Sequence, residues 1–450
     1  MRRSDATVSV QYDSRPGIVK RIYRNMGLLL GGKAGAGIFS LLYMIIAARA
    51  LGPRDYGILI LVHGYTITIG GILCFPGWHA IIRYGSEALR RQAPEALVRL
   101  LRLAGAIELG AGLLAIIVAA ALAPLIGPRL GWSPEAQMLA VPYSLAVLAS
   151  VRATPAGYLQ LMNRFDLIGV HNSVSPLVRL VGAAIAAFLG AGLSGFLMVW
   201  LLAALAEGLV MWLFGLREAR RHMVDHRLMG LPHGAVGENS GILRFMIAAN
   251  ADVTFAELAP RIAPLIVGWV LGPTATGLFA VAQRATVVIQ QPAQILGQAA
   301  YAEFAKLAPS KDDRARLRRA LITSTGIAVA IAIPIVVALA VWSDELITII
   351  GGAAFTAAGP LLLWLIFARL VLVAMPPASA ALVALGRPAL SVTANAATSL
   401  ALMPAMPLFM MHFGLLGAGM HSLLQAIAVA VLLGWFVWRA SRDEMDKPGD

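Results

Sequence analysis

Long apolar stretches, separated by short polar clusters, dominate the sequence. Twelve of these stretches contain roughly 20 or more mostly apolar residues, the length that a helix needs to cross a bilayer. They cover residues 25–48, 57–82, 102–126, 137–161, 168–190, 193–215, 244–271, 277–302, 320–342, 355–384, 389–411 and 414–438. The pattern predicts an all-α polytopic membrane protein with about twelve transmembrane helices.

The connections between these stretches are short, and none could hold an inserted soluble domain. The longest lies near the middle of the chain and is basic. Six stretches on each side of it predict two six-helix lobes. We expect an N-terminal tail (1–24), a first lobe (25–215), an inter-lobe loop (216–243), a second lobe (244–438) and a C-terminal tail (439–450).

Composition supports lipid as the main solvent of this chain. Of its 450 residues 59% are hydrophobic and only 13% are charged, and the mean hydropathy is +0.77. A soluble domain carries about 25% charged residues. The single cysteine, Cys74, excludes an internal disulfide and a cysteine-based zinc site. No HExxH, CxxC or paired-histidine spacing occurs, so we expect neither a metal nor a cofactor.

The net charge of +13 does not indicate nucleic-acid binding, because the basic residues fall in short clusters between apolar runs. By our count, 26 of the 36 Lys and Arg lie on one side of the predicted membrane. The opposite side holds only Arg49, Arg54 and Arg129. Since basic loops stay in the cytoplasm, we expect both termini to be cytoplasmic.

One short motif occurs twice, 220 residues apart: ALGPRDYGIL at Ala50–Leu59 and VLGPTATGLF at Val270–Phe279. Gly52 and Gly272 can end a helix in a left-handed conformation, and the proline after each cannot continue it. The motif by itself predicts a tight hairpin between two spans. Because six spans separate the copies, the halves enter the membrane from the same side. Such parallel repeats are typical of transporters with a central cleft.

Charged residues inside the predicted spans are seven basic (Lys33, Arg152, Arg179, Arg244, Arg261, Arg284 and Arg369) and four acidic (Glu108, Glu207, Asp252 and Glu257). Each charge at mid-membrane costs roughly 2.5–3.5 kcal/mol, so they must be paired, near headgroups or in a wet cavity. The excess of basic groups favours an anion, and arginine suits phosphate. Arg284, with no acid one turn away on its helix, is the strongest candidate.

Several of these residues have competing interpretations. Glu257 and Arg261 stand one helical turn apart and are expected to pair. Asp252 and Glu207 are candidates for ion or proton coupling, or else counter-ions of nearby arginines. The histidines His63, His79, His171 and His421 are either hydrogen-bonded helix contacts or proton relays.

The stretches ARALGPRDYGILIL and GWVLGPTATGLFAVAQRATVVIQQPAQILGQA resemble polysaccharide-exporting flippases of the Wzx/PST type. These belong to the multidrug/oligosaccharidyl-lipid/polysaccharide exporter superfamily. The second stretch is also similar to the lipid II flippase branch, where an arginine and a proline stand as Arg284 and Pro292 do here. That branch usually has fourteen spans, whereas twelve are predicted here, and its basic residues in the first two helices are only loosely matched by Lys33. Both departures favour the polysaccharide branch.

The resemblance implies two lobes around a V-shaped, MATE-like cavity. It implies transport of a polyprenyl-pyrophosphate-linked oligosaccharide across the bacterial inner membrane, with Arg284, Arg261, Arg179 and Lys33 against the pyrophosphate. Membrane lipids and other polysaccharide assembly proteins are the expected partners, and no enzymatic activity is implied. The alternatives are a cation-coupled multidrug antiporter on the same architecture and a membrane polysaccharide polymerase or ligase. The last would be expected to carry a long external catalytic loop, which the sequence lacks.

Overall fold

The computed structural model describes residues 18–74, 77–222, 241–287 and 314–443, together with 237, 289 and 304. Throughout this part of the chain the regular structure is helical, without strands. The helices of the first half are α1 (Ile18–Leu73), α2 (Trp78–Arg90), α3 (Pro94–Ile126), α4 (Pro134–Tyr143), α5 (Ala153–Leu161), α6 (Phe165–His171), α7 (Val174–Phe188) and α8 (Gly192–His222), with 3-10 turns η1 (Pro128–Leu130) and η2 (Ser144–Ser150).

The helices of the second half begin with α10, which follows the basic middle of the chain. They are α10 (Ile242–Ala285), α12 (Arg314–Val341), α13 (Ser343–Gly351), α14 (Gly359–Leu372), α15 (Met375–Ala384), α16 (Pro388–Leu402), α17 (Ala405–Phe413) and α18 (Leu415–Asp443), with the 3-10 turn η3 (Ala353–Ala358). The described helices α1, α8, α10 and α18 extend past the predicted lobe limits by a few residues.

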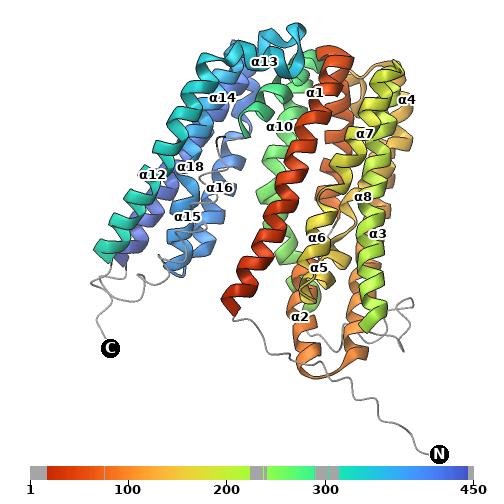
Figure 1. The fold of residues 1–450 in the computed structure, drawn as a ribbon, viewed down its shortest axis with the longest axis vertical. Coiled ribbons are helices and arrows are strands. Elements are labelled where there is room, and N and C mark those ends of the chain that lie inside the picture. The colour runs from red at the N-terminus through yellow and green to blue at the C-terminus, as the bar shows by residue number, and fades with distance from the viewer. Residues whose placement is uncertain are drawn as a thin grey trace, which may run out of the picture.

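Each Leu-Gly-Pro motif turns the chain back on itself. Gly52 interrupts α1 with φ 70° and ψ 176°, and Gly272 interrupts α10 with φ 84° and ψ 178°. This region of conformational space is open almost only to glycine. In Figure 1, α1 rises in red to the top of the molecule and its orange continuation descends toward α2. The predicted hairpins are therefore confirmed, and each long helix consists of two spans.

The number of spans depends on how these turns and breaks are counted. In the described part of the chain, nine helices are long and apolar enough to cross a membrane, or ten if α16 and α17, bent by 50°, form one span. The sequence-based total of about twelve counts the two sides of the Gly52 and Gly272 turns separately. Part of the predicted span 277–302 lies outside the described residues.

Prolines account for several interruptions that the apolar pattern alone did not locate. The predicted span 355–384 breaks between α14 and α15 just before Pro376 and Pro377, and 389–411 breaks at Pro404. Proline lacks the N–H that would continue the hydrogen-bond ladder. By contrast, α10 keeps helical geometry at Pro260 and Pro264, and its non-helical backbone angles occur at Gly272.

The buried apolar side chains form three cores, and their distribution defines the shape of the molecule. The largest joins both halves, from Met44 to Ala418. A second core belongs to α2, α3, α5 and α8 with the start of α10. The third belongs to the second half, from Phe304 to Ala440. We call the end with the shared core and the two glycine turns the closed end, and the end with separate cores the open end.

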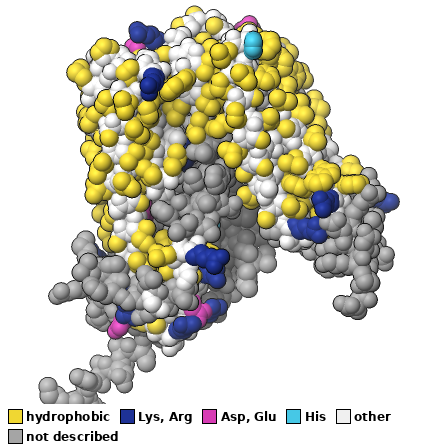
Figure 2. Space-filling view, turned by 180° about the vertical axis from the view of Figure 1, so that it is seen from behind, with side chains coloured by type: hydrophobic (Ala, Val, Ile, Leu, Met, Phe, Trp, Pro, Cys, Tyr) yellow, Lys and Arg dark blue, Asp and Glu magenta, His cyan; other side chains and the backbone are white. Residues whose placement is uncertain are grey.

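The surface agrees with this arrangement. The two halves part toward the open end in Figure 1. Large apolar side chains lie exposed on the outer faces, for example Phe188 at 91% and Val341 at 66%. Such a surface is stable in contact with lipid rather than water. Basic side chains gather at the lower, open end in Figure 2.

Candidate functional site

The two turns pack against each other at the closed end. Gly57, four residues after Pro53, lies against the backbone carbonyl of Pro273, and Gly277 lies against the carbonyl of Pro53. A Cβ atom at either glycine would overlap the opposing oxygen. The second glycine of each motif therefore has a role that the hairpin alone does not explain. It allows the two lobes to approach at backbone distance.

A stripe of glycines at seven-residue spacing continues this seam along the second half of α1. After Gly57, Gly64 faces Leu265 and Gly71 faces the guanidinium of Arg261. Residues seven apart fall on nearly the same helix face. Arg261, one of the predicted substrate residues, therefore lies in the seam between the lobes, where Gly71 leaves room for it. The side chain of Glu257, its predicted partner, lies outside the described residues.

The repeat places Arg284 where the other half has Gly64. At the offset of 220 residues these two positions correspond, so the second half carries an arginine where the first half carries a glycine. Arg284 is half-buried, and among the described residues no hydrogen bond or ion pair engages it. A guanidinium without a partner among the described residues is the group expected at an anion-binding position.

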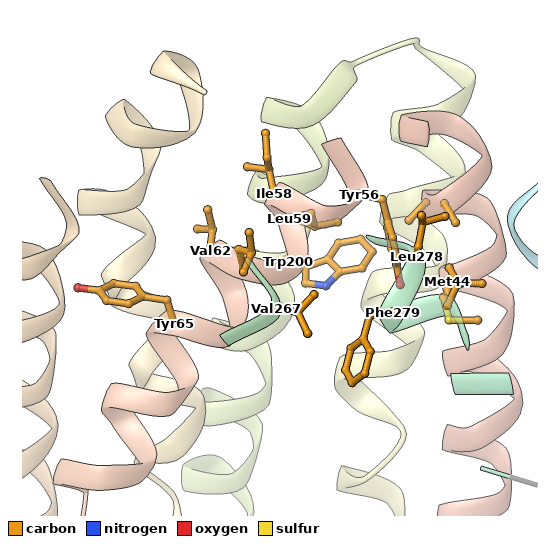
Figure 3. Close-up of a cluster of buried hydrophobic side chains, with 14 of the residues drawn as sticks. Met44, Tyr56, Ile58, Leu59, Val62, Tyr65, Trp200, Val267, Leu278 and Phe279 are labelled. Carbon is orange, nitrogen blue, oxygen red and sulfur yellow. The ribbon is translucent and has the colours of Figure 1, made fainter. Parts of the chain in front are cut away.

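Arg179, the predicted substrate arginine of the first lobe, lies on α7 among aromatic side chains. The guanidinium packs over the rings of Tyr43 and Trp200, with centroid distances of 5.7 and 5.3 Å. Figure 3 shows Tyr56 and Trp200 within the apolar cluster that both lobes build.

Hydrogen bonds hold Arg179 from one side. Arg179 Nη2 lies 3.0 Å from His63 Nε2, and Nη1 lies 3.5 Å from the hydroxyl of Tyr43. On the other side of the His63 ring, Nδ1 lies 2.9 Å from the Tyr143 hydroxyl. The sequence identified Arg179 and His63 separately but gave no signal that they meet. Their helices are joined only by tertiary packing.

Lys33 occupies a different place from the arginines. It is exposed on the first half of α1, and within the described residues it has no ion-pair partner. Its neighbour Gly32 lies against the backbone of Gly169 at the end of α6. The glycine at position 32 therefore allows α1 and α6 to pack at backbone distance.

The two candidates for ion coupling are Glu207 and Asp252. Glu207 on α8 forms an ion pair with Arg152, and its backbone carbonyl bonds to Nε2 of His171 at 2.9 Å. The ion pair with Arg152 agrees with the interpretation of Glu207 as a counter-ion. The side chain of Asp252 lies outside the described residues. In the part of the chain that the structure describes, no cluster of three His, Cys, Asp or Glu side chains could hold a metal.

Glu108, another intramembrane acid, binds backbone N–H groups at the start of α5. Its carboxylate accepts hydrogen bonds from the N–H groups of Ala153 and of Thr154, the latter at 2.8 Å. These are free donors in the first turn of α5, which a helix leaves without internal partners. A carboxylate there also suits the positive end of the helix dipole. Glu108 is therefore a structural cap.

At the open end, Arg164 joins the loop before α6 to the end of α8. It bonds to Asp166 at 2.9 and 3.0 Å and to the buried carboxylate of Glu218 at 2.5 Å. These bonds hold the pKa of the Arg164 guanidinium above its ordinary value. This basic residue therefore stabilises the first lobe internally.

An apolar groove lies between the lobes, beside the seam. It has a volume of about 760 Å³ and is lined by α1 around Tyr65, the end of α3, η1, α10 from Ile262 to Val270, and α17. Trp269 on its wall packs against the guanidinium of Arg129, 5.9 Å from the ring centroid. The groove lies between the lobes and can hold a narrow apolar chain.

Comparisons with known proteins extend these observations. A family model described as "Polysaccharide biosynthesis protein" matches residues 46–360. The inner membrane protein YghQ of Escherichia coli (strain K12) is 26% identical over 293 residues, which are 65% of this chain and 82% of that protein. The family match spans more than half of the chain and includes both glycine turns.

Solved structures show the same fold at low sequence identity. The lipid II flippase MurJ in an inward closed conformation has a TM-score of 0.68 and 14% identity, covering 93% of each chain. An inward-facing multidrug resistance MATE family transporter of the MOP superfamily has a TM-score of 0.64 and 15% identity, covering 96% of this chain and 99% of that one. The predicted family resemblance is confirmed: the chain belongs to the polysaccharide biosynthesis protein family and has the two-lobed helical fold of MOP-superfamily transporters.

Proposed function

We propose that this protein is an inner-membrane flippase that carries a polyprenyl-pyrophosphate-linked oligosaccharide from the cytoplasmic to the external leaflet. The family match and the transporter fold support export in polysaccharide assembly. The relative in Escherichia coli is an inner membrane protein, which supports the same membrane here. The basic open end is then cytoplasmic, together with both termini.

The observation that carries this proposal is the half-buried guanidinium of Arg284, on α10, in the lobe opposite to the one that holds Arg179 on α7. A diphosphate has two negative groups, so one arginine from each lobe could bind it. The planar donor fork of arginine matches phosphate oxygens. Because Arg284 has no hydrogen-bond or ion-pair partner among the described residues, it can bind a phosphate without first losing another contact.

The apolar groove supports a lipid-linked rather than a free substrate. Its walls are nearly all hydrocarbon, so an isoprenoid chain loses little on leaving the bilayer for it. The diphosphate would enter the polar cluster between the lobes while the chain remains in apolar surroundings. Parting of the lobes at one end and then the other would expose the headgroup to each side in turn.

The same arrangement disfavours a multidrug antiporter for organic cations. Such a substrate would meet Arg179 and Arg284 where it requires acidic or aromatic groups. Trp200 and the tyrosines of the cluster are aromatic, but a guanidinium already occupies the space over Trp200 and Tyr43. A diphosphate is the better electrostatic match.

Reconstituted vesicles with a labelled polyprenyl-pyrophosphate disaccharide test the proposal. Leaflet-specific enzymatic access to the sugar reports flipping. We expect Arg284→Ala to slow flipping by an order of magnitude or more, since a hydrogen bond to a charged group contributes about 1.5–3 kcal/mol. Arg284→Lys should recover only part of the rate.

The matched control is Arg91→Ala, which removes an exposed cation just after α2 that pairs with Glu87. It should leave the rate unchanged. Full flipping by Arg284→Ala would refute the phosphate role of that residue. Failure of the parent protein to flip any lipid-linked sugar would refute the proposed function itself.

A further inference from the structure

His63 lies between two groups that fix its protonation state. Arg179 Nη2 approaches its Nε2 atom at 3.0 Å, and the Tyr143 hydroxyl approaches its Nδ1 atom at 2.9 Å. The rings of His63 and Tyr143 meet edge to face, with centroids 6.2 Å apart. Three helices, α1, α4 and α7, supply these residues and hold the chain of contacts in place.

The chemistry of arginine determines the tautomer. A guanidinium has only donors, so in the Arg179 contact the lone pair of His63 Nε2 must accept. The proton of the neutral ring then resides on Nδ1, where it is donated to the Tyr143 oxygen. In this arrangement a second proton on His63 would remove the acceptor of Arg179 and place two positive charges in contact.

The surroundings contain few other groups that could change this balance. In the hydrogen-bonded contacts of His63, the titratable or charged groups are Tyr143 on α4 and Arg179 on α7, followed by Tyr43 on α1, which contacts Arg179. From α8 the nearby side chain is the uncharged Trp200. Among the described residues, Arg179 is the charged group in hydrogen-bond contact with His63.

We infer that His63 is a proton-binding site coupled to anion binding: when a phosphate-bearing ligand draws Arg179 away, His63 Nε2 takes a proton from water. The inference rests on the proposed function, in which Arg179 binds the diphosphate. A phosphate that takes both donors of the guanidinium leaves the His63 lone pair free, and the added positive charge then stabilises the anion. The coupling is reciprocal, so protonation of His63 also releases Arg179 toward the ligand.

Calorimetric titration of the full-length protein in detergent with inorganic pyrophosphate tests this inference. Titrations in two buffers of different ionisation enthalpy count the protons taken up per anion bound. Pyrophosphate exchanges protons itself, so the informative quantity is the difference between variants at one pH. We expect His63→Gln to bind pyrophosphate with about one proton fewer than the parent, and to lose an affinity gain of up to about tenfold per pH unit on acidification.

The matched control is His421→Gln. His421 is another intramembrane histidine, but its Nε2 contacts the carbonyl of Leu402 at 2.8 Å and therefore donates. It should bind pyrophosphate with the proton count of the parent. If His63→Gln does not fold, Arg179→Gln provides the same test, because the anion would no longer change the protonation of His63.

A proton count in His63→Gln or Arg179→Gln equal to that of the parent would overturn the inference, whether or not the vesicles show flipping. A lower count in His63→Gln together with no flipping by the parent would leave the inference standing and refute the proposed function. Absence of pyrophosphate binding by the parent would overturn both the proton site and the diphosphate assignment.

Discussion

Gly57 of the first turn lies directly against the main-chain carbonyl of Pro273 in the second turn. The reverse contact, between Gly277 and the carbonyl of Pro53, completes a reciprocal pair. Two further contacts brace the same end: Arg49 donates to the carbonyl of Ile349 at 2.6 Å, and Tyr56 meets the ring of Phe355. The repeated motif thus provides both the hairpin of each lobe and the surface on which the lobes close.

Alanine at Gly57 or Gly277 should destabilise this closed end. A buried methyl group pressed against a carbonyl typically costs about 1–3 kcal/mol through overpacking. Thermal unfolding in detergent measures the change, and flipping in vesicles should fall in parallel because the closed end no longer seals.

Gly434→Ala provides the control for that substitution. Gly434 is a helical glycine of α18 with open space at the Cβ position. Alanine there should stabilise the helix by up to about 1 kcal/mol. The two substitutions therefore have opposite expected signs. Equal stabilisation at Gly57 and Gly434 would contradict the reciprocal packing.

Glu207 and Arg152 offer a test of pairing against ion coupling. Glu207→Gln leaves the Arg152 guanidinium without its counter-charge, and we expect a loss of about 1–2 kcal/mol because the pair is partly exposed. The double variant Arg152→Met with Glu207→Gln should regain most of that stability. If Glu207→Gln instead unfolds like the parent yet transports nothing, Glu207 has a functional role that pairing does not explain.

Glu108 should matter for stability more than its position on a lipid-spanning helix suggests. Glu108→Ala leaves the N–H groups of Ala153 and Thr154 without their acceptor, at a cost of about 2–4 kcal/mol. Glu95→Ala, which removes an exposed acid 3.4 Å from Arg99 on the same helix, should change stability by less than about 1 kcal/mol. Unfolding midpoints of the two variants compare these effects, and similar midpoints would argue against the cap.

The apolar groove should discriminate by chain length. Ile262→Trp fills part of the groove, so we expect slower flipping of a long polyprenyl substrate and a smaller effect on a short-chain analogue. Val341→Trp adds the same side chain to a lipid-facing position on α12 and should change neither rate. An equal slowing of both substrates by Ile262→Trp would indicate general damage to the seam rather than a chain-binding groove.

Some features were predictable because they depend on local chemistry. Only glycine tolerates the backbone conformation at Gly52 and Gly272, and proline after it prevents a continuous helix, so the two turns were evident in the sequence. The breaks at Pro376 and Pro404 had a visible cause, but the apolar run continued past them and concealed their positions. The candidate site was predicted residue by residue, as Arg284, Arg261, Arg179 and Lys33, without the distances among them.

The sequence by itself determined that this chain spans a membrane, that its halves are parallel repeats and that basic side chains exceed acidic ones inside the spans. These properties follow from hydropathy, periodicity and the cost of charge in lipid, which are local or additive quantities. Only the tertiary structure decided which charges meet. Arg152 pairs with Glu207, Glu108 caps α5, and Arg179 bonds to His63, because helices distant in the chain pack in one specific register.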